Sequence, residues 1–138
     1  MRRALAVRPR APVPCNNDLL AANFLDDGER VWIIDYEYSG NNDAFFELGN
    51  TSTECGFSPE QTDAWVEAYA GSPTPADLAR VRLQALCSCY GWSLWGFIQA
   101  AASPIEFDFW EWGMERYEKA AAIFGSADFD RLLARVAS

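Results

Sequence analysis

The chain has 138 residues, of which 50% are hydrophobic, and this is enough for one domain with a buried core. Its net charge of −9 argues against broad nucleic-acid binding, because phosphate contacts need clustered Lys and Arg. Histidine is absent, so Ser-His-Asp and Cys-His catalysis within this chain are excluded.

Charge and aromatic content are the two features of the composition that bear on a ligand. An acidic chain suits a cationic or metal-bound ligand, although solubility alone also explains the charge. Six tryptophans are many for this length, and they either fill a core or line a ligand pocket.

Cysteine usage and hydropathy predict a soluble cytoplasmic protein. The four cysteines form no CxxC pair, so we expect reduced thiols and no zinc site. No run approaches the roughly 18 apolar residues of a membrane span. The N-terminal apolar stretch is too short for a signal peptide. We therefore expect no membrane partner.

The N-terminal residues 1–14 are basic and end in a Pro-rich stretch, RPRAPVP. This pattern is typical of the end of a helix followed by an extended connector. A helix this short at the start of a chain is marginal alone, so we expect something to be missing upstream.

A β-hairpin follows. Two apolar runs flank Asp27-Gly28, which is a strong hairpin signal, and the charges of Asp26, Asp27 and Glu29 are expected to be solvated. The second run, Val31 to Ile34, is β-branched and aromatic, and it predicts a buried strand.

The open ends of this hairpin bring three polar residues together. Asn23 enters the first strand and Asp35 leaves the second, so both should lie at one mouth. Asp18 is placed just upstream of that mouth.

After a Gly/Asn-rich loop at 39–43 the chain is predicted to be helical to its end. Ser58-Pro59 and Thr74-Pro75 each combine an N-cap with proline at the first helical position. The patterns predict a short apolar segment over 45–50, helices over about 58–71, 74–103 and 108–124, and a last helix at the C-terminus. One hairpin with four or more helices makes a mostly helical α+β domain.

The hairpin mouth has the chemistry of a phosphotransfer site. Phosphoryl transfer needs a carboxylate that orients the attacking hydroxyl, and oxygen ligands for Mg²⁺. The D-x-x-x-x-N spacing from Asp18 to Asn23 is common by chance, but a hairpin that ends in Ile-Ile-Asp at Asp35 makes it more specific.

The stretches CNNDLLAANFL, WIIDYEYSG, NNDAFFELGN and GWSLWGFIQAAASPIEFDF resemble the choline/ethanolamine kinase family, within the aminoglycoside-phosphotransferase and protein-kinase-like group. The motifs keep their order from Pro14 to near Phe124. The resemblance implies the C-terminal lobe of a protein-kinase-like fold, with a catalytic-loop hairpin followed by a helical bundle. It also implies ATP and Mg²⁺ as cofactors, and transfer of the γ-phosphate to the hydroxyl of a small cationic amino alcohol such as choline.

The resemblance implies catalytic roles for individual residues. Asp18 would be the base facing the substrate hydroxyl, and Asn23 and Asp35 would bind Mg²⁺. Glu37 would lie by the metal or the substrate pocket. Asn16 stands where the family has His, a residue that braces the loop against the segment after the metal-binding Asp.

The resemblance also implies a substrate pocket. Glu54 matches an acidic residue of the cationic pocket, Trp92 and Trp95 match aromatic positions around the ammonium group, and Phe107 and Trp112 complete the wall. A permanent cation without hydrogen-bond donors is best held by aromatic faces, and residues three apart share one helical face. Packing in the core is the alternative explanation of the tryptophan pair.

Several features depart from the family pattern. Ala21 and Ala44 replace prolines, the sequence has no G-x-G-x-x-G loop, and its single lysine is Lys119. The resemblance thus implies a connector over 1–14 and a kinase-like lobe over 15–138, without the nucleotide-binding lobe. The surface facing that lobe would be exposed and prone to self-association.

Other functions stay open at this point. The chain is alternatively a non-catalytic binding module for quaternary ammonium ligands, a pseudokinase fragment, or a kinase for an aminoglycoside or a thiamine-like substrate. Trp65 and Trp110 match no motif and are expected in the core or an interface.

Overall fold

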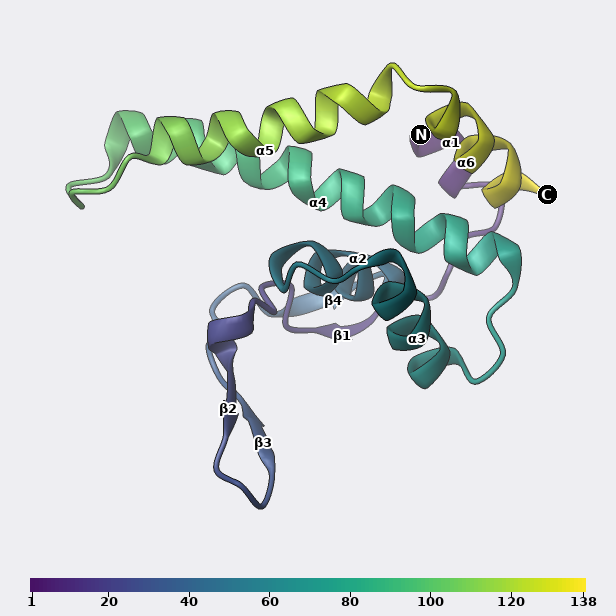
Figure 1. The fold of residues 1–138 in the computed structure, drawn as a ribbon, viewed down its shortest axis with the longest axis horizontal. Helices are drawn as coiled ribbons and strands as arrows, with labels where there is room; N and C mark the ends of the chain where they lie inside the picture. The colour runs from purple at the N-terminus through teal and green to yellow at the C-terminus, as the bar shows by residue number, and fades with distance from the viewer.

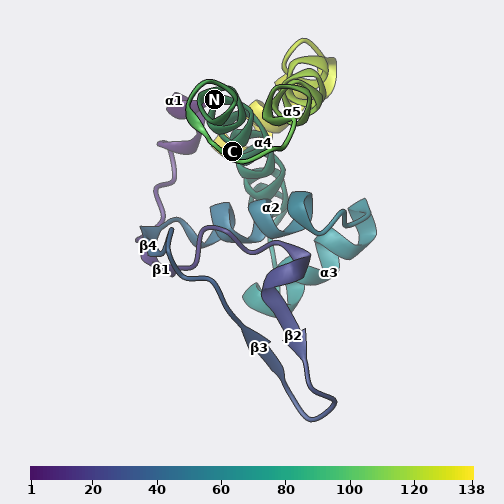
Figure 2. The ribbon, with the colours of Figure 1, turned by 90° about the vertical axis from the view of Figure 1, so that its left-hand side faces the viewer.

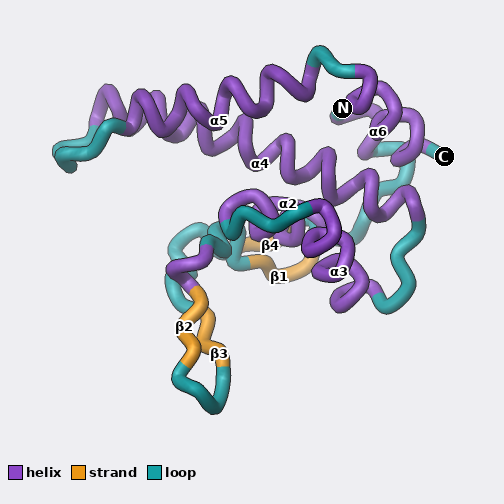
Figure 3. Tube along the Cα trace, in the orientation of Figure 1, coloured by secondary structure: helices purple, strands orange, loops and turns teal.

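The computed structural model describes all of residues 1–138, and it is a mostly helical fold with two small antiparallel sheets (Figure 3). The elements in chain order are α1 (Arg2–Leu5), β1 (Val13–Cys15), the 3₁₀-helix η1 (Ala21–Asn23), β2 (Phe24–Asp26), β3 (Val31–Ile33), β4 (Gly40–Asn42), α2 (Ala44–Glu54), α3 (Pro59–Ala70), α4 (Pro75–Ala102), α5 (Phe109–Phe124) and α6 (Ala127–Ala137). The predicted α+β, mostly helical class is confirmed.

The helices begin where their capping residues predicted. Ser58 and Thr74 each form a complete capping box, with Gln61 and Asp77 respectively, and proline follows each cap. Asp108 caps α5 by accepting a hydrogen bond from the backbone N–H of Glu111. Local side-chain chemistry therefore determines these starts.

The 28-residue helix α4 is the centre of the fold. It packs against α2 on one side and against α5 on the other, and α1 and α6 lie near its N-terminal end (Figure 1). Three groups of buried side chains lie along it: Phe45, Leu48, Val66 and Val81; Ala79, Leu83 and Val136; and Leu86, Cys89 and Ala120.

The predicted hairpin is confirmed. Phe24 pairs with Ile33 and Asp26 with Val31, and Gly28 adopts φ +86° in the turn. The charges of Asp26, Asp27 and Glu29 are exposed, as predicted.

The prediction that Val31 to Ile34 form a buried strand is wrong. Val31 is 59% exposed and Trp32 49% exposed, because the hairpin extends away from the helices with nothing packed on it (Figure 2). A continuous apolar run indicates a covered strand but does not identify what covers it.

The loop predicted over 39–43 contains a strand, so that prediction is also wrong in part. β4 pairs antiparallel with β1, with Val13 opposite Asn42 and Cys15 opposite Gly40. Gly and Asn disfavour strands, and this pairing joins distant parts of the chain, so no local signal announces it.

The four cysteines are free thiols, and Cys15 and Cys89 are buried. None of the helices has the length and hydropathy of a membrane-crossing segment. Trp65 packs against the α2–α4 core, whereas Trp110 is 58% exposed.

Candidate active site

The hairpin mouth brings Asn23, Asp35 and Asp18 together. The backbone N–H of Ile34 donates to the carbonyl of Asn23 at 3.1 Å, so the residues on either side of the hairpin opening are adjacent. The side-chain amide of Asn23 donates to the carbonyl of Asp18 at 2.9 Å. The D-x-x-x-x-N spacing thus closes into a hydrogen-bonded loop.

Asp18 lies in a concentration of negative charge. Burial, and after it the charges of Asp35, Glu54, Glu37 and Glu47, raise its pKa from 3.8 to about 6. Three of these residues, Asp35, Glu37 and Glu54, are ones that the sequence assigned to the site. At neutral pH Asp18 is mostly ionised and able to accept a proton.

Asn16 connects the two halves of this site. Its side-chain amide donates to the carbonyl of Asp35 at 2.7 Å, and its amide oxygen accepts from the backbone N–H of Asp18 at 2.9 Å. Only 6% of Asn16 is exposed. Asn16 therefore bridges the loop and the residue that follows the hairpin.

Two backbone conformations at the site are unusual. Asn17 has φ 69° and Asp35 has φ 62°, in the left-handed region that Asn and Asp tolerate better than other residues with a side chain. The carboxylate of Glu47 accepts the backbone N–H groups of Asn16 at 2.7 Å and Asn17 at 2.8 Å, which holds the loop. Glu47 was not predicted from the sequence, where its only signal is its place in FFELGN.

Asn50 links this loop to α4. Its amide oxygen accepts from the hydroxyl of Ser88 at 2.6 Å and from the indole N–H of Trp92 at 2.9 Å. Its amide nitrogen donates to the carbonyl of Asn17 at 3.4 Å. The orientation of Trp92 is therefore tied to the catalytic loop through one buried side chain, which sequence reasoning also missed.

The predicted aromatic residues form one continuous group, here called the aromatic cluster. Trp92 contacts Tyr38 with ring centroids 5.6 Å apart and Trp95 at 5.8 Å. Trp95 contacts Trp112 at 5.6 Å. The cluster consists of Tyr38, Trp92, Trp95, Phe107, Phe109 and Trp112.

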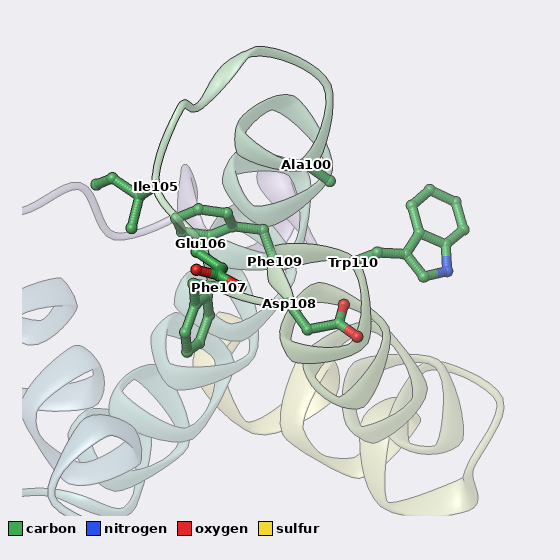
Figure 4. Close-up of a pocket in the computed structure, with 7 residues that line it drawn as sticks. All are labelled: Ala100, Ile105, Glu106, Phe107, Asp108, Phe109 and Trp110. Atoms are coloured by element: carbon green, nitrogen blue, oxygen red, sulfur yellow. The ribbon is translucent and has the colours of Figure 1, made fainter.

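The far end of the aromatic cluster borders an open hollow of about 500 Å³ at the α4–α5 connection. Figure 4 shows Glu106 and Phe107 together there, with the side chain of Trp110 directed away from them. The hollow includes Phe107 and Phe109 but neither Asp18 nor Asp35.

Glu54 pairs with a residue that the sequence analysis did not single out. Arg116 donates from Nη2 to Oε2 of Glu54 at 3.0 Å, and its guanidinium carbon lies 3.5 Å from the centroid of the Trp112 ring. No motif marked Arg116, since its contact with Glu54 joins α5 to the end of α2 across 62 positions of the chain.

Asn23 and Asp35 at the hairpin mouth carry amide and carboxylate oxygens, the types of ligand that Mg²⁺ prefers. No group of three or more His, Cys, Asp or Glu side chains is arranged for a metal. Mg²⁺, however, is usually held by one or two carboxylates together with substrate phosphates. The amide nitrogen of Asn23 is used by Asp18, which leaves its oxygen for a cation, and the charges that raise the Asp18 pKa favour one.

The chain is similar to known kinases over most of its length. It is 32% identical over 126 residues to human ethanolamine kinase 2 and 30% identical over 130 residues to a probable ethanolamine kinase of Arabidopsis thaliana. These matches cover 76% and 79% of this chain, but 33% and 35% of the relatives. The chain therefore spans about a third of the length of the curated relatives it matches. No family model matches it.

Solved structures agree with these matches. A choline/ethanolamine kinase family protein from Mesorhizobium loti superposes with a TM-score of 0.90 at 39% identity, over 99% of this chain and 47% of that one. An ethanolamine kinase of Plasmodium vivax shares the fold, with a TM-score of 0.73 at 24% identity, over 87% of this chain and 36% of that one. By sequence and by fold, the chain belongs to the choline/ethanolamine kinase family.

Proposed function

We propose that this chain is the catalytic and substrate-binding part of a phosphotransferase that transfers the γ-phosphate of ATP to the hydroxyl of a small cationic amino alcohol. The main support is that the side chain of Asn50 forms hydrogen bonds with both Asn17, next to Asp18, and Trp92 of the aromatic cluster. A substrate with a cationic head and a hydroxyl a few bonds away matches that arrangement.

In this proposal Asp18 accepts the proton of the substrate hydroxyl, and its raised pKa places it near the range of an efficient base. Trp92 and Trp95 hold the ammonium group by cation–π attraction of about 0.5–2 kcal/mol per ring. Glu37 adds negative charge beside Asp18.

Asn23 and Asp35 would hold Mg²⁺. The chemistry supplied at these two residues would be neutralisation of the negative charge on the phosphates of ATP. Asn16 holds Asp35 close to Asp18 through its two hydrogen bonds, one to the backbone of each residue.

The proposal is tested by two measurements, one of amine binding and one of phosphate transfer. Titration calorimetry with choline and with ethanolamine should show binding that Trp92→Ala weakens about tenfold. Trp110→Ala, at an exposed position outside the aromatic cluster, is the matched control. Affinities unaffected by Trp92→Ala would exclude the aromatic cluster as the amine site.

Transfer is measured with MgATP on this chain and on a form extended upstream to include a nucleotide-binding lobe. We expect transfer by the extended form, and Asp18→Asn should reduce it by about 10²- to 10⁴-fold. Wild-type rates in the Asp18→Asn variant would contradict the role of Asp18.

A second candidate is a module that binds the ammonium ligand without transferring phosphate. The aromatic cluster favours it, because an unbroken series of ring contacts runs from Tyr38 through Trp92 and Trp95 to Trp112. Amine binding with no transfer by the extended form would select this function.

A further inference from the structure

A cation of the protein itself lies among the residues predicted to bind the substrate cation. Arg116 projects from α5, and its side chain is 17% exposed. It contacts Glu54 at 3.0 Å and covers Trp112, with 3.5 Å between the guanidinium carbon and the ring centroid. Two of the positions that the sequence assigned to the ammonium pocket are thus already occupied.

This ion pair is incomplete. Arginine and a carboxylate can form two parallel hydrogen bonds, but Oε1 of Glu54 and Nε of Arg116 are both buried without a partner. A buried charge pair with unpaired polar atoms contributes little net stability. The arrangement is therefore better explained by what it does to the pocket than by what it adds to the fold.

The position of Arg116 has a direct consequence for a bound amine. A guanidinium on Trp112 repels a second cation there and covers the ring face that such a cation would contact. Three other members of the aromatic cluster, Tyr38, Trp92 and Trp95, are contiguous with one another, and the Trp92 indole is tied through Asn50 to the loop of Asp18.

On the basis of the proposed function, we propose that Arg116 is a specificity-determining residue: its guanidinium is a resident cation between Glu54 and Trp112, and it confines the substrate ammonium to the Tyr38, Trp92 and Trp95 side of the aromatic cluster. The pocket so confined suits a compact ammonium group. Removal of Arg116 uncovers a carboxylate and an aromatic face, which together suit a quaternary head without N–H groups.

The position of the Arg116 guanidinium is tested by removing it in Arg116→Ala and supplying a guanidinium from solution. Thermal unfolding of Arg116→Ala is followed with millimolar methylguanidinium chloride against NaCl at equal ionic strength. Methylguanidinium should raise the midpoint of this variant and leave the wild type and Arg116→Ala/Glu54→Gln unchanged. Lys119→Ala, which removes another positive charge from α5, should also show no shift. If the midpoint of Arg116→Ala does not shift, or if all variants shift equally, the guanidinium does not occupy the proposed position between Glu54 and Trp112.

The specificity role is tested by the ratio of choline to ethanolamine affinity, measured by calorimetry. Arg116→Ala should raise this ratio about tenfold, and Arg116→Lys, which keeps a charge beside Glu54 and so supports folding, should raise it less. An unchanged ratio in both folded variants overturns the proposal, because a purely structural residue would weaken both amines alike. A wild type that binds neither amine overturns both the proposed function and the specificity role. The methylguanidinium shift then still tests whether the Arg116 guanidinium lies between Glu54 and Trp112.

Discussion

Asp18 carries an energetic cost that can be measured. Its pKa is 3.8 in an ordinary environment and about 6 here, so the folded chain holds this proton more tightly than the unfolded chain. Stability therefore falls as pH rises from about 4 to 6, and the loss persists above that range. A rise in pKa from 3.8 to about 6 corresponds to ~3 kcal/mol, which partial solvent exposure reduces to about 1–2 kcal/mol.

Asp18→Asn removes this charge and should stabilise the fold by that amount at pH 7. Near pH 4, where Asp18 holds its proton in the folded chain, the variant and the wild type should be about equally stable. Urea unfolding at both pH values measures the difference. A variant less stable than the wild type at pH 7 would show that burial and the neighbouring carboxylates do not raise the pKa of Asp18 as described.

Asn16 is a second residue whose contribution can be isolated. Asn16→Asp keeps the oxygen that accepts from Asp18 but loses the donor to Asp35, and adds charge beside Glu47. We expect a loss of about 1–3 kcal/mol in the free energy of unfolding. The control is Asn41→Asp in β4, where the side chain is exposed. If urea unfolding gives equal losses of stability for the two variants, the bridging role of Asn16 is contradicted.

At this scale the sequence predicts residues whose partners are near in the chain. Asp18, Asn23 and Asp35 could be grouped because a five-residue spacing and one hairpin bring them together. Glu47 and Asn50 could not be grouped, since they reach Asn16 and Trp92 across 31 and 42 positions. Such contacts depend on how helices pack, which no local pattern encodes.

Among the elements, α2 and α4 approach each other closely at Gly49. A methyl group there would lie 2.5 Å from the backbone nitrogen of Ala85 and 2.8 Å from the carbonyl oxygen of Val81. Gly49→Ala should therefore force the two helices apart, at about 1–3 kcal/mol. Thermal unfolding measures the loss.

Gly91→Ala is the matched control for Gly49→Ala. Gly91 lies inside α4, and a methyl group there meets nothing within 4 Å. Alanine should stabilise the helix at that position by about 0.5–1 kcal/mol. If Gly49→Ala were also neutral or stabilising, the tight α2–α4 contact would be contradicted.

Helices were predictable as elements because their caps are local. Ser58 and Thr74 satisfy the first backbone N–H groups within three residues, so sequence and structure agree at these starts. The β1–β4 pair was not predictable, because Gly40 and Asn42 have no strand propensity and pair with residues far upstream. Pairing across the chain overrides local preference there.

At the scale of the whole molecule, the hairpin is where the sequence pattern and the structure disagree most. The run from Val31 to Ile34 has the composition of a covered strand, yet it is exposed on a hairpin that leaves the helical body (Figure 1). Periodicity shows that a surface is apolar, and only the assembled structure shows whether the chain itself covers it.

This exposed hairpin predicts self-association. Its apolar side chains are 40–59% exposed at Val31, Trp32, Ile33 and Ile34, and Leu25 on the facing strand is 48% exposed. Both β2 and β3 have an unpaired edge, which is an open template for another strand.

Sedimentation velocity should therefore show a sedimentation coefficient that rises with concentration. The double change Val31→Lys/Ile33→Lys should abolish the rise, because two charges at the strand edge oppose pairing. Val7→Lys, equally exposed but outside the hairpin, should not. A wild type that stays monomeric at about 100 μM would contradict the prediction, as would equal association of all three proteins.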